Sequence, residues 1–302
     1  MESTFRQGII YSLTAYLLWG ILPIYWKTLG VVQAFEILSN RFIWSCVFVW
    51  ILIIASGRVK SFLAETQDIF TNPKQALAML AAAITISFNW GLFIWAVNDG
   101  RIVETSMGYY INPLVSIVFG VFFLKERLDN WQMAAVICAV IGVGTMVWNL
   151  GQLPWVSVSL AVSFALYGLI KKCLSVTTMT SIMLETLLIT PLALAYEYYL
   201  SLHGTSAYQT AETSTLIMLA CAGVVTATPL LFFTAGAKLL PLKIIGFFTV
   251  YCSNNQFADR RFYVRRKLHI RTYGRFWLDM VWSVFIYYST DKTAVKIELS
   301  SS

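Results

Sequence analysis

Residues 105–124 read TSMGYYINPLVSIVFGVFFL, a run of 20 positions without a charged side chain. A helix needs about 20 mostly apolar residues to cross the hydrocarbon core of a bilayer. Similar runs recur along the chain, at residues 8–26, 33–56, 76–97, 131–148, 155–170, 178–200 and 215–237. The sequence therefore predicts an all-α, polytopic membrane protein with eight spans, and a ninth span is expected to begin near Ile244.

The composition agrees with this class. Of the 302 residues, 58% are hydrophobic and only 12% are charged, which is too few to cover the surface of a soluble domain of this size. The first run is too long for a secretory signal peptide, carries Trp19, Pro23 and Trp26, and is not followed by a small-residue cleavage site. We expect it to stay in the mature protein as a span.

Charged residues between the runs indicate the orientation. The segments on one side of the predicted membrane have only two basic residues, Lys27 and Arg101. Those on the opposite side have ten: Arg6, Arg58, Lys60, Lys74, Lys125, Arg127, Lys171, Lys172, Lys238 and Lys243. Because cytoplasmic loops are enriched in lysine and arginine, the N-terminus is predicted to be cytoplasmic.

Enzymatic chemistry finds little support in the sequence. The two histidines, His203 and His269, form no pair, and there is no glycine-rich phosphate loop or nucleophile motif. The five cysteines are scattered singly, without metal-ligand spacing. We predict no catalytic residue, no metal site and no cofactor.

The net charge of +7 comes mostly from the C-terminal part of the chain. Residues 251–302 carry nine basic and four acidic residues, against 13 and 11 in residues 1–250. Such a run is typical of a solvated cytoplasmic extension that prefers the membrane surface, and nucleic-acid binding is not expected. The predicted partners are the lipid bilayer and a small-molecule substrate, and the oligomeric state is left open.

Internal similarity divides the chain into two halves, as in many transporters. Three pairs of positions match between the halves: Met79-Leu80-Ala81 with Met218-Leu219-Ala220, Trp19-Gly20 with Tyr167-Gly168, and Glu36 with Glu185. We predict a first five-helix repeat over residues 8–149 and a second over residues 153–248.

The second repeat is interrupted after Phe248, where residues 249–302 are polar and basic. The fourth span of the first half, YINPLVSIVFGVFFLKE (residues 110–126), has no counterpart there. Codons can be chosen for the tail whose shifted frame reads YIAPTISLLIGVFMYGE, which is identical to the fourth span at eight of 17 positions. We predict that one extra base beside the codon of Thr249 puts this aberrant tail out of frame and disrupts the ninth and tenth spans.

Three stretches carry a family resemblance: LLWGILPIYWK (Leu17 to Lys27), EILSNRFIWS (Glu36 to Ser45) and YYINPLVSIVFGVFFLKERL (Tyr109 to Leu128). They resemble the RarD-type proteins of the drug/metabolite transporter superfamily, whose members carry two EamA-type repeats. The resemblance covers residues 1–248 and implies ten helices in two inverted five-helix repeats. It also implies a bacterial inner-membrane location and a permease role linked by name to chloramphenicol sensitivity.

Polar residues inside the predicted spans are candidates for a substrate path, because a charge at mid-membrane costs at least about 2.5–3.5 kcal/mol. Glu36 and Asn40 share one face of the second span, and Arg41 lies roughly 140° away from Glu36. Glu36 suits a proton or a substrate amine, and Arg41 suits an anionic group. The alternative is that both lie near the helix end and reach the interface.

Glu185, in the seventh span, is the candidate for a deep acid. A buried carboxyl group there suits alternating protonation in proton-coupled transport. The alternative is a structural hydrogen bond to a neighbouring helix.

The predicted path is completed by residues of four other spans. Asn112 beside Pro113 is the most pointed signal, because proline frees a backbone carbonyl group that needs a polar partner in a bilayer. The alternative is a kink that only shapes packing. The full set adds Trp19, Asn89, Trp90, Tyr110, Asn112, Pro113 and Tyr167.

The sequence thus predicts a secondary transporter of small metabolites or drugs, driven by an ion gradient or by exchange. The alternatives are a non-transporting membrane sensor or assembly factor, and an inactive frameshifted transporter. The sequence does not name the substrate.

Overall fold

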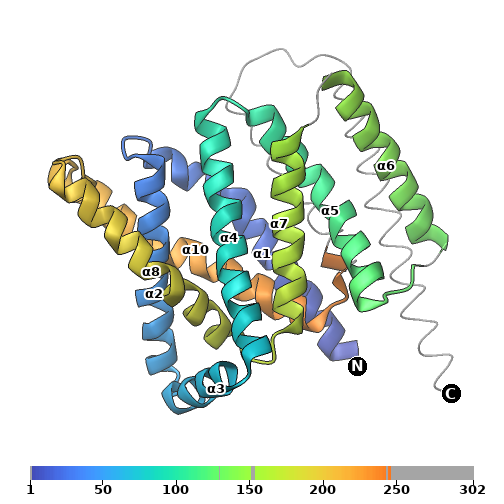
Figure 1. Cartoon of the computed structure of the whole chain (residues 1–302), viewed down its shortest axis with the longest axis horizontal. Coiled ribbons are helices and arrows are strands. Elements are labelled where there is room, and N and C mark those ends of the chain that lie inside the picture. Colours follow the sequence, from blue (N-terminus) through green and yellow to red (C-terminus); the bar gives the residue numbers. More distant parts are fainter. Residues whose placement is uncertain (1, 129, 151–153, 243, 246–302) are drawn as a thin grey trace.

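A computed structural model describes residues 2–128, 130–150, 154–242 and 244–245 (Figure 1). The chain is all-helical over these residues and has no strand there. The described helices are α1 (Glu2–Thr28), α2 (Ala34–Ala55), α3 (Val59–Thr71), α4 (Pro73–Asn98), α5 (Ile102–Leu124), α6 (Asn130–Leu150), α7 (Trp155–Cys173), α8 (Thr178–Leu202), α9 (Ala207–Thr210) and α10 (Thr213–Leu239).

The apolar runs correspond to the long helices. Each of the eight runs falls almost wholly within one of α1, α2, α4, α5, α6, α7, α8 and α10. Among the described residues, α2, α4, α7, α8 and α10 are long and apolar enough to cross a membrane. The chain is therefore a polytopic membrane protein.

The short helix α3 lies in a segment expected to be a charged loop between two spans. Phe62 and Ile69 are both buried and lie seven positions apart, so they share one helix face. Lys60 and Asp68 are exposed to solvent. This apolar spacing is the signal that predicts an amphipathic helix here. In Figure 1, α3 lies at the lower edge of the bundle.

The long helices pack side by side in one bundle (Figure 1). Helix α10 contacts both α1 and α2, and α8 contacts both α2 and α4. Helix α7 packs against α4 and α5, while α6 packs against α5 at the outer edge of the bundle. The main apolar core includes the fully enclosed rings of Tyr167 and Phe233.

Small residues set the spacing of α10 against its neighbours. A β-carbon on Gly223 would come within 2.5 Å of the Ser45 backbone nitrogen and closer still to the carbonyl group of Trp44. Ser45 donates a hydrogen bond from Oγ to the Gly223 carbonyl oxygen at 3.0 Å. A β-carbon on Gly236 would overlap Ser12 Oγ on α1. Such close approach of backbones is typical of helix pairs in membranes.

The predicted aberrant tail lies outside the described residues. The described part of the chain ends at Ile245, so the predicted change of reading frame beside Thr249 and the tenth span remain predictions. Ile244, where the ninth span is expected to begin, is helical.

Candidate functional site

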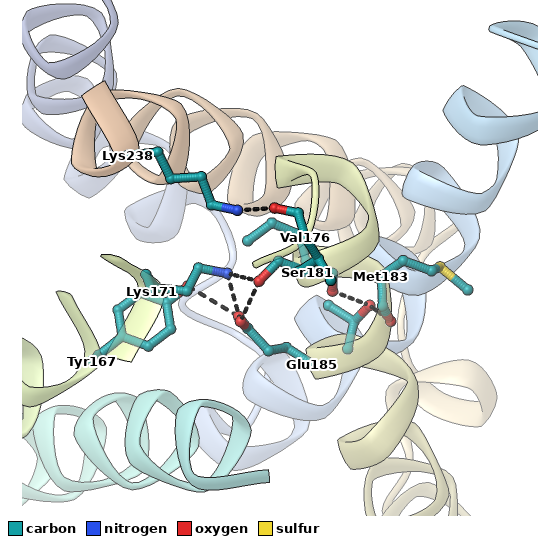
Figure 2. A network of polar contacts seen from close by, with 9 residues as sticks. Tyr167, Lys171, Val176, Ser181, Met183, Glu185 and Lys238 are labelled. Atoms are coloured by element: carbon teal, nitrogen blue, oxygen red, sulfur yellow. Dashed lines mark hydrogen bonds and ion pairs between the residues drawn. The ribbon is translucent and has the colours of Figure 1, made fainter. Parts of the chain in front are cut away.

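A buried ion pair joins α7 to α8 (Figure 2). Lys171 Nζ lies 2.5 Å from Glu185 Oε1 and donates to Ser181 Oγ at 2.7 Å. The Tyr167 hydroxyl group donates to Glu185 Oε2 at 3.0 Å, and Ser181 Oγ donates to Oε1 at 3.2 Å. Lys171 and Tyr167 are 0% exposed and Glu185 is 3% exposed. Both carboxylate oxygens are thus bound by donors in a site closed to solvent.

Helical spacing explains this arrangement. Tyr167 and Lys171 are four positions apart on α7, and Ser181 and Glu185 are four positions apart on α8, so each pair lies on one helix face. Lys171, counted above among the charges between the runs, lies within α7, which continues to Cys173 and buries the amine. A buried ammonium group is tolerated here because a carboxylate lies opposite it.

Trp19 reaches the same region through an aromatic contact. Its ring centroid lies 5.5 Å from that of Phe233, and the Tyr167 centroid lies 6.1 Å from the same ring. Trp19 and Tyr167, which the predicted repeat pairs, therefore contact one side chain of α10.

The connection between α7 and α8, residues 174–177, is bound by three other helices. Glu65 Oε2 on α3 accepts hydrogen bonds from the backbone N–H and the hydroxyl group of Thr177, at 2.8 and 3.0 Å. Two further contacts come from α4 and α10: the Ser175 N–H donates to Gln75 Oε1 at 3.2 Å, and Lys238 donates to the Val176 carbonyl oxygen (Figure 2).

Glu65 lies on the short helix α3, outside the long helices, and its hydrogen bonds lower the pKa of its carboxyl group. Partial burial raises the pKa of Glu65, but hydrogen bonds from Thr177, Thr180 and Ser61 outweigh burial and hold the pKa below its usual value. A carboxyl group with a lowered pKa stabilises the fold above its unfolded pKa, and this contribution is lost as the pH falls through the folded pKa. The contact with Thr177 is therefore made by a charged carboxylate at neutral pH.

A second polar cluster lies where α2 begins. Glu36 Oε1 accepts a hydrogen bond from the Ala207 N–H at 2.5 Å and another from Ser206 Oγ at 3.2 Å. Ser206 is the N-cap residue of α9. Because Glu36 is only 1% exposed, it is buried against the connection between α8 and α10 rather than reaching the surface.

Asn40, one turn further along α2, extends this cluster to α8. Asn40 Nδ2 donates to Glu197 Oε1 at 2.7 Å, and the Tyr208 hydroxyl group donates to Asn40 Oδ1 at 2.5 Å. Trp44 Nε1 in turn donates to the Tyr208 hydroxyl oxygen at 3.1 Å. Asn40 is fully buried, and its amide group links α2 to α8 and α9, whereas Tyr208 at the edge of this network is exposed.

Arg41 faces a different set of partners. Its guanidinium carbon lies 4.0 Å from the ring centroid of Trp90 and 4.7 Å from that of Trp26, so both indoles make cation–π contacts. Arg41 Nε donates to Thr226 Oγ1 at 3.0 Å. Helices α1, α4 and α10 therefore hold this side chain, in agreement with the expected separation of Glu36 and Arg41 around α2.

The other predicted site residues lie apart from these clusters. Asn89 Nδ2 donates to the Leu160 carbonyl oxygen at 2.9 Å and to Ser163 Oγ at 2.8 Å, both on α7. Asn112 Oδ1 accepts a hydrogen bond from Ser116 Oγ at 3.2 Å within α5, where Pro113 is buried. The side chain of Tyr110 lies outside the described part of the structure. The predicted residues thus form separate groups rather than one site.

Comparison with known proteins identifies the family. The EamA-like transporter family matches residues 6–148. Protein RarD of Escherichia coli (strain K12) is 41% identical over 243 residues, which cover 80% of this chain and 81% of that protein. The uncharacterized transporter YojE of Bacillus subtilis (strain 168) is 43% identical over 242 residues, 80% of each chain. The chain belongs to the RarD-type family of the drug/metabolite transporter superfamily.

A RarD-type chain is a membrane transporter of that superfamily. A more distant relative in Pseudomonas aeruginosa, named chloramphenicol-sensitive protein RarD, is 30% identical over 241 residues, 80% of each chain. The fold is also similar to one crystal structure, with a TM-score of 0.69, 15% identity, and coverage of 92% of this chain and 96% of that chain. This last likeness concerns the fold alone.

Several residues of the polar clusters around Glu185 and Glu36 were not predicted from the sequence. Lys171 is hidden among the basic residues at the end of an apolar run, although its four-residue spacing from Tyr167 is a usable signal. Glu197 follows the last strongly apolar turn of α8, and Tyr208 lies in a polar connection. No local pattern distinguishes these two residues from an interface side chain, since their roles depend on contact with Asn40.

Proposed function

We propose that this RarD-type chain is a secondary transporter of small metabolites or drugs across the bacterial inner membrane, with its N-terminus in the cytoplasm. The setting of Arg41 carries the proposal. A guanidinium group within a long apolar helix is held by Trp26 and Trp90, and such intramembrane charges mark substrate or ion paths. Because the sequence has no ATP-binding motif, an ion gradient or exchange supplies the energy.

The same setting favours a class of substrate. The guanidinium group is a planar cation, and the two indole rings that it contacts add aromatic surface to the same region. Small planar molecules with an anionic group fit this combination. The link by name with chloramphenicol sensitivity makes chloramphenicol one compound to include among those tested.

Two inverted five-helix repeats, over residues 8–149 and 153–248, are part of the proposal. If α1, α2 and α4 correspond to α7, α8 and α10, the helix contacts pair up. The contact of α1 with α10 then matches that of α7 with α4, and the contact of α2 with α10 matches that of α8 with α4. The contact of α2 with α8 is its own counterpart. This pattern supports the repeat, and the inverted symmetry supports alternating access between the halves.

Replacing Arg41 by glutamine is expected to lower substrate flux by about tenfold or more, because charge-assisted contacts contribute about 1.5–3 kcal/mol each. The measurement is flux of labelled small aromatic anions and chloramphenicol into proteoliposomes containing the purified protein.

Arg101 provides the matched control. It also lies over two indoles, with its guanidinium carbon 5.5 Å from the centroids of Trp95 and Trp155, but it is partly exposed and paired with Asp99. Arg101→Gln is expected to leave flux unchanged. Absence of flux for every compound with the unaltered protein would instead favour a sensor or an assembly factor.

An inactive frameshifted product is the other alternative, and it concerns residues 249–302. We expect the nucleotide sequence around codon 249 to contain one extra base. A gene with that base removed is expected to give a higher yield of membrane-inserted protein and a higher flux. Equal yield and flux from the two genes would show that the tail is harmless.

A further inference from the structure

Each half of the bundle has a short helix between its second and third long helices. Helix α3 lies between α2 and α4, and α9 lies between α8 and α10. Each short helix contacts the start of the second long helix of the other half: α3 binds Thr177 before α8, and Glu36 at the start of α2 binds α9. Helices α2 and α8 begin at opposite ends of the bundle, so the two junctions do also (Figure 1).

The two junctions use the same chemistry. In each junction, one carboxylate oxygen accepts two hydrogen bonds at the start of a helix. One comes from the hydroxyl group of the N-cap residue and the other from a backbone N–H. Glu36 binds Ser206, the N-cap of α9, together with Ala207, and Glu65 binds Thr177, the N-cap of α8. Backbone N–H groups at the start of a helix have no partner within it, so each carboxylate satisfies such a group, and hydrogen bonds to a carboxylate are stronger than neutral ones.

The junctions differ in which partner supplies the acid. At one end, Glu36 belongs to the long helix and the N-cap belongs to the short helix α9. At the other end, Glu65 belongs to the short helix α3 and the N-cap belongs to the long helix α8. Glu36 is 1% exposed, whereas Glu65 is only partly buried and Thr177 is exposed. Water therefore reaches the Glu65 contact but not the Glu36 contact.

Helix α2 connects the two junctions mechanically. It carries Glu36 in its first turn, and only residues 56–58 separate its last residue from α3, which carries Glu65. This link is tight, since Gly57 has a φ of 64° and the Arg58 N–H donates to the Ile53 carbonyl oxygen at 3.0 Å. A tilt of α2 against α8 and α10 therefore displaces the Glu36 contact and the Glu65 contact in opposite directions, because they lie at opposite ends of this helix pair.

We propose that Glu36 and Glu65 are paired latches, each of which holds one end of the bundle closed by binding an N-cap in the other half. The latches open alternately, because α2 and α3 move as one lever. Both latches are closed in this structure. The proposal rests on the proposed transport function, since alternate opening serves a protein that moves a solute from one side to the other.

Hydrogen–deuterium exchange of the full chain in lipid nanodiscs tests the latches without a substrate. Glu36→Gln is expected to increase amide exchange in residues 204–211 by about tenfold or more, because it weakens a charge-assisted contact. The same variant is expected to slow exchange in residues 174–180. Glu65→Gln is expected to have the reverse effects on the two segments.

Slower amide exchange at the end opposite the substitution distinguishes a pair of coupled latches from two independent structural contacts. Increased exchange at the altered end alone, or no change at either end, would overturn the proposal. Ser206→Ala and Thr177→Val weaken the same contacts from the partner side and provide a milder pair of variants. Asp68→Asn on α3 and Glu212→Gln before α10, both at exposed positions, are controls expected to change neither segment.

Failure of the latches and failure of the proposed function give different results. Reciprocal exchange without flux in proteoliposomes would leave the latches standing and reject transport of the tested compounds. Flux that depends on Arg41, without reciprocal exchange, would leave the transport function standing and reject the latches.

Discussion

Replacing Gly223 by alanine is expected to destabilise the protein by about 1–3 kcal/mol, towards the upper end of what overpacking usually costs. The added β-carbon would overlap the backbone of Trp44 and Ser45, which cannot rotate away as a flexible side chain can. Relief requires α2 and α10 to separate, and that movement also breaks the hydrogen bond from Ser45 Oγ to the Gly223 carbonyl oxygen. The loss is measured as a lower apparent melting temperature of the purified protein.

Gly91 is the matched control for this substitution. It also lies inside a long helix, α4, but a β-carbon there meets no atom within 4 Å. Gly91→Ala is expected to stabilise the protein by about 0.5–1 kcal/mol, because alanine favours a helix more than glycine does. Equal effects of the two substitutions would contradict the close approach of α2 and α10.

Replacing Lys171 by methionine is expected to cost about 3–5 kcal/mol, because it leaves the buried carboxylate of Glu185 without its cation. Methionine is close to lysine in length and removes little packing volume. The effect should therefore come from the lost charge, and it is measured as a large fall in the melting temperature and in the yield of folded protein. Lys74→Met, at an exposed position of α4, is the control and is expected to have little effect.

The double variant distinguishes an ion pair from a general need for polar groups. Replacing Lys171 by methionine and Glu185 by leucine together removes both charges, and a well-packed apolar pair is often as stable as the ion pair that it replaces. We expect the double variant to recover most of the stability lost in Lys171→Met. A double variant as unstable as the sum of the two single variants would show that the two side chains do not act as a pair.

The long helices were predictable because a bilayer imposes a strong and local requirement. A helix that crosses hydrocarbon must be apolar along its whole length, so a run such as residues 105–124 is evident without knowledge of its neighbours. The short helix α3 lies under a weaker requirement. Only Phe62 and Ile69 are buried along it, and a search for long apolar runs passes over that spacing.

The candidate site was predictable only in part, because its assembly depends on distant contacts. Glu36, Arg41 and Glu185 stand out as polar residues in apolar runs, and each has specific partners in the structure. The identity of those partners does not follow from a local pattern. Glu197, for example, gains its role from Asn40, which lies 157 positions earlier in the chain.

The buried pair of Lys171 and Glu185 has a consequence for synthesis of the protein in the cell. Lys171 precedes Glu185 by 14 positions, so it leaves the ribosome first and reaches the membrane as an unmatched cation. At that stage it acts as a topology signal that holds the end of α7 on one side. Once α8 follows, the same charge is neutralised inside the helical hairpin. A chain that lacks Glu185 therefore buries this cation without its counter-charge, and the defect is expected in packing of the α7–α8 hairpin.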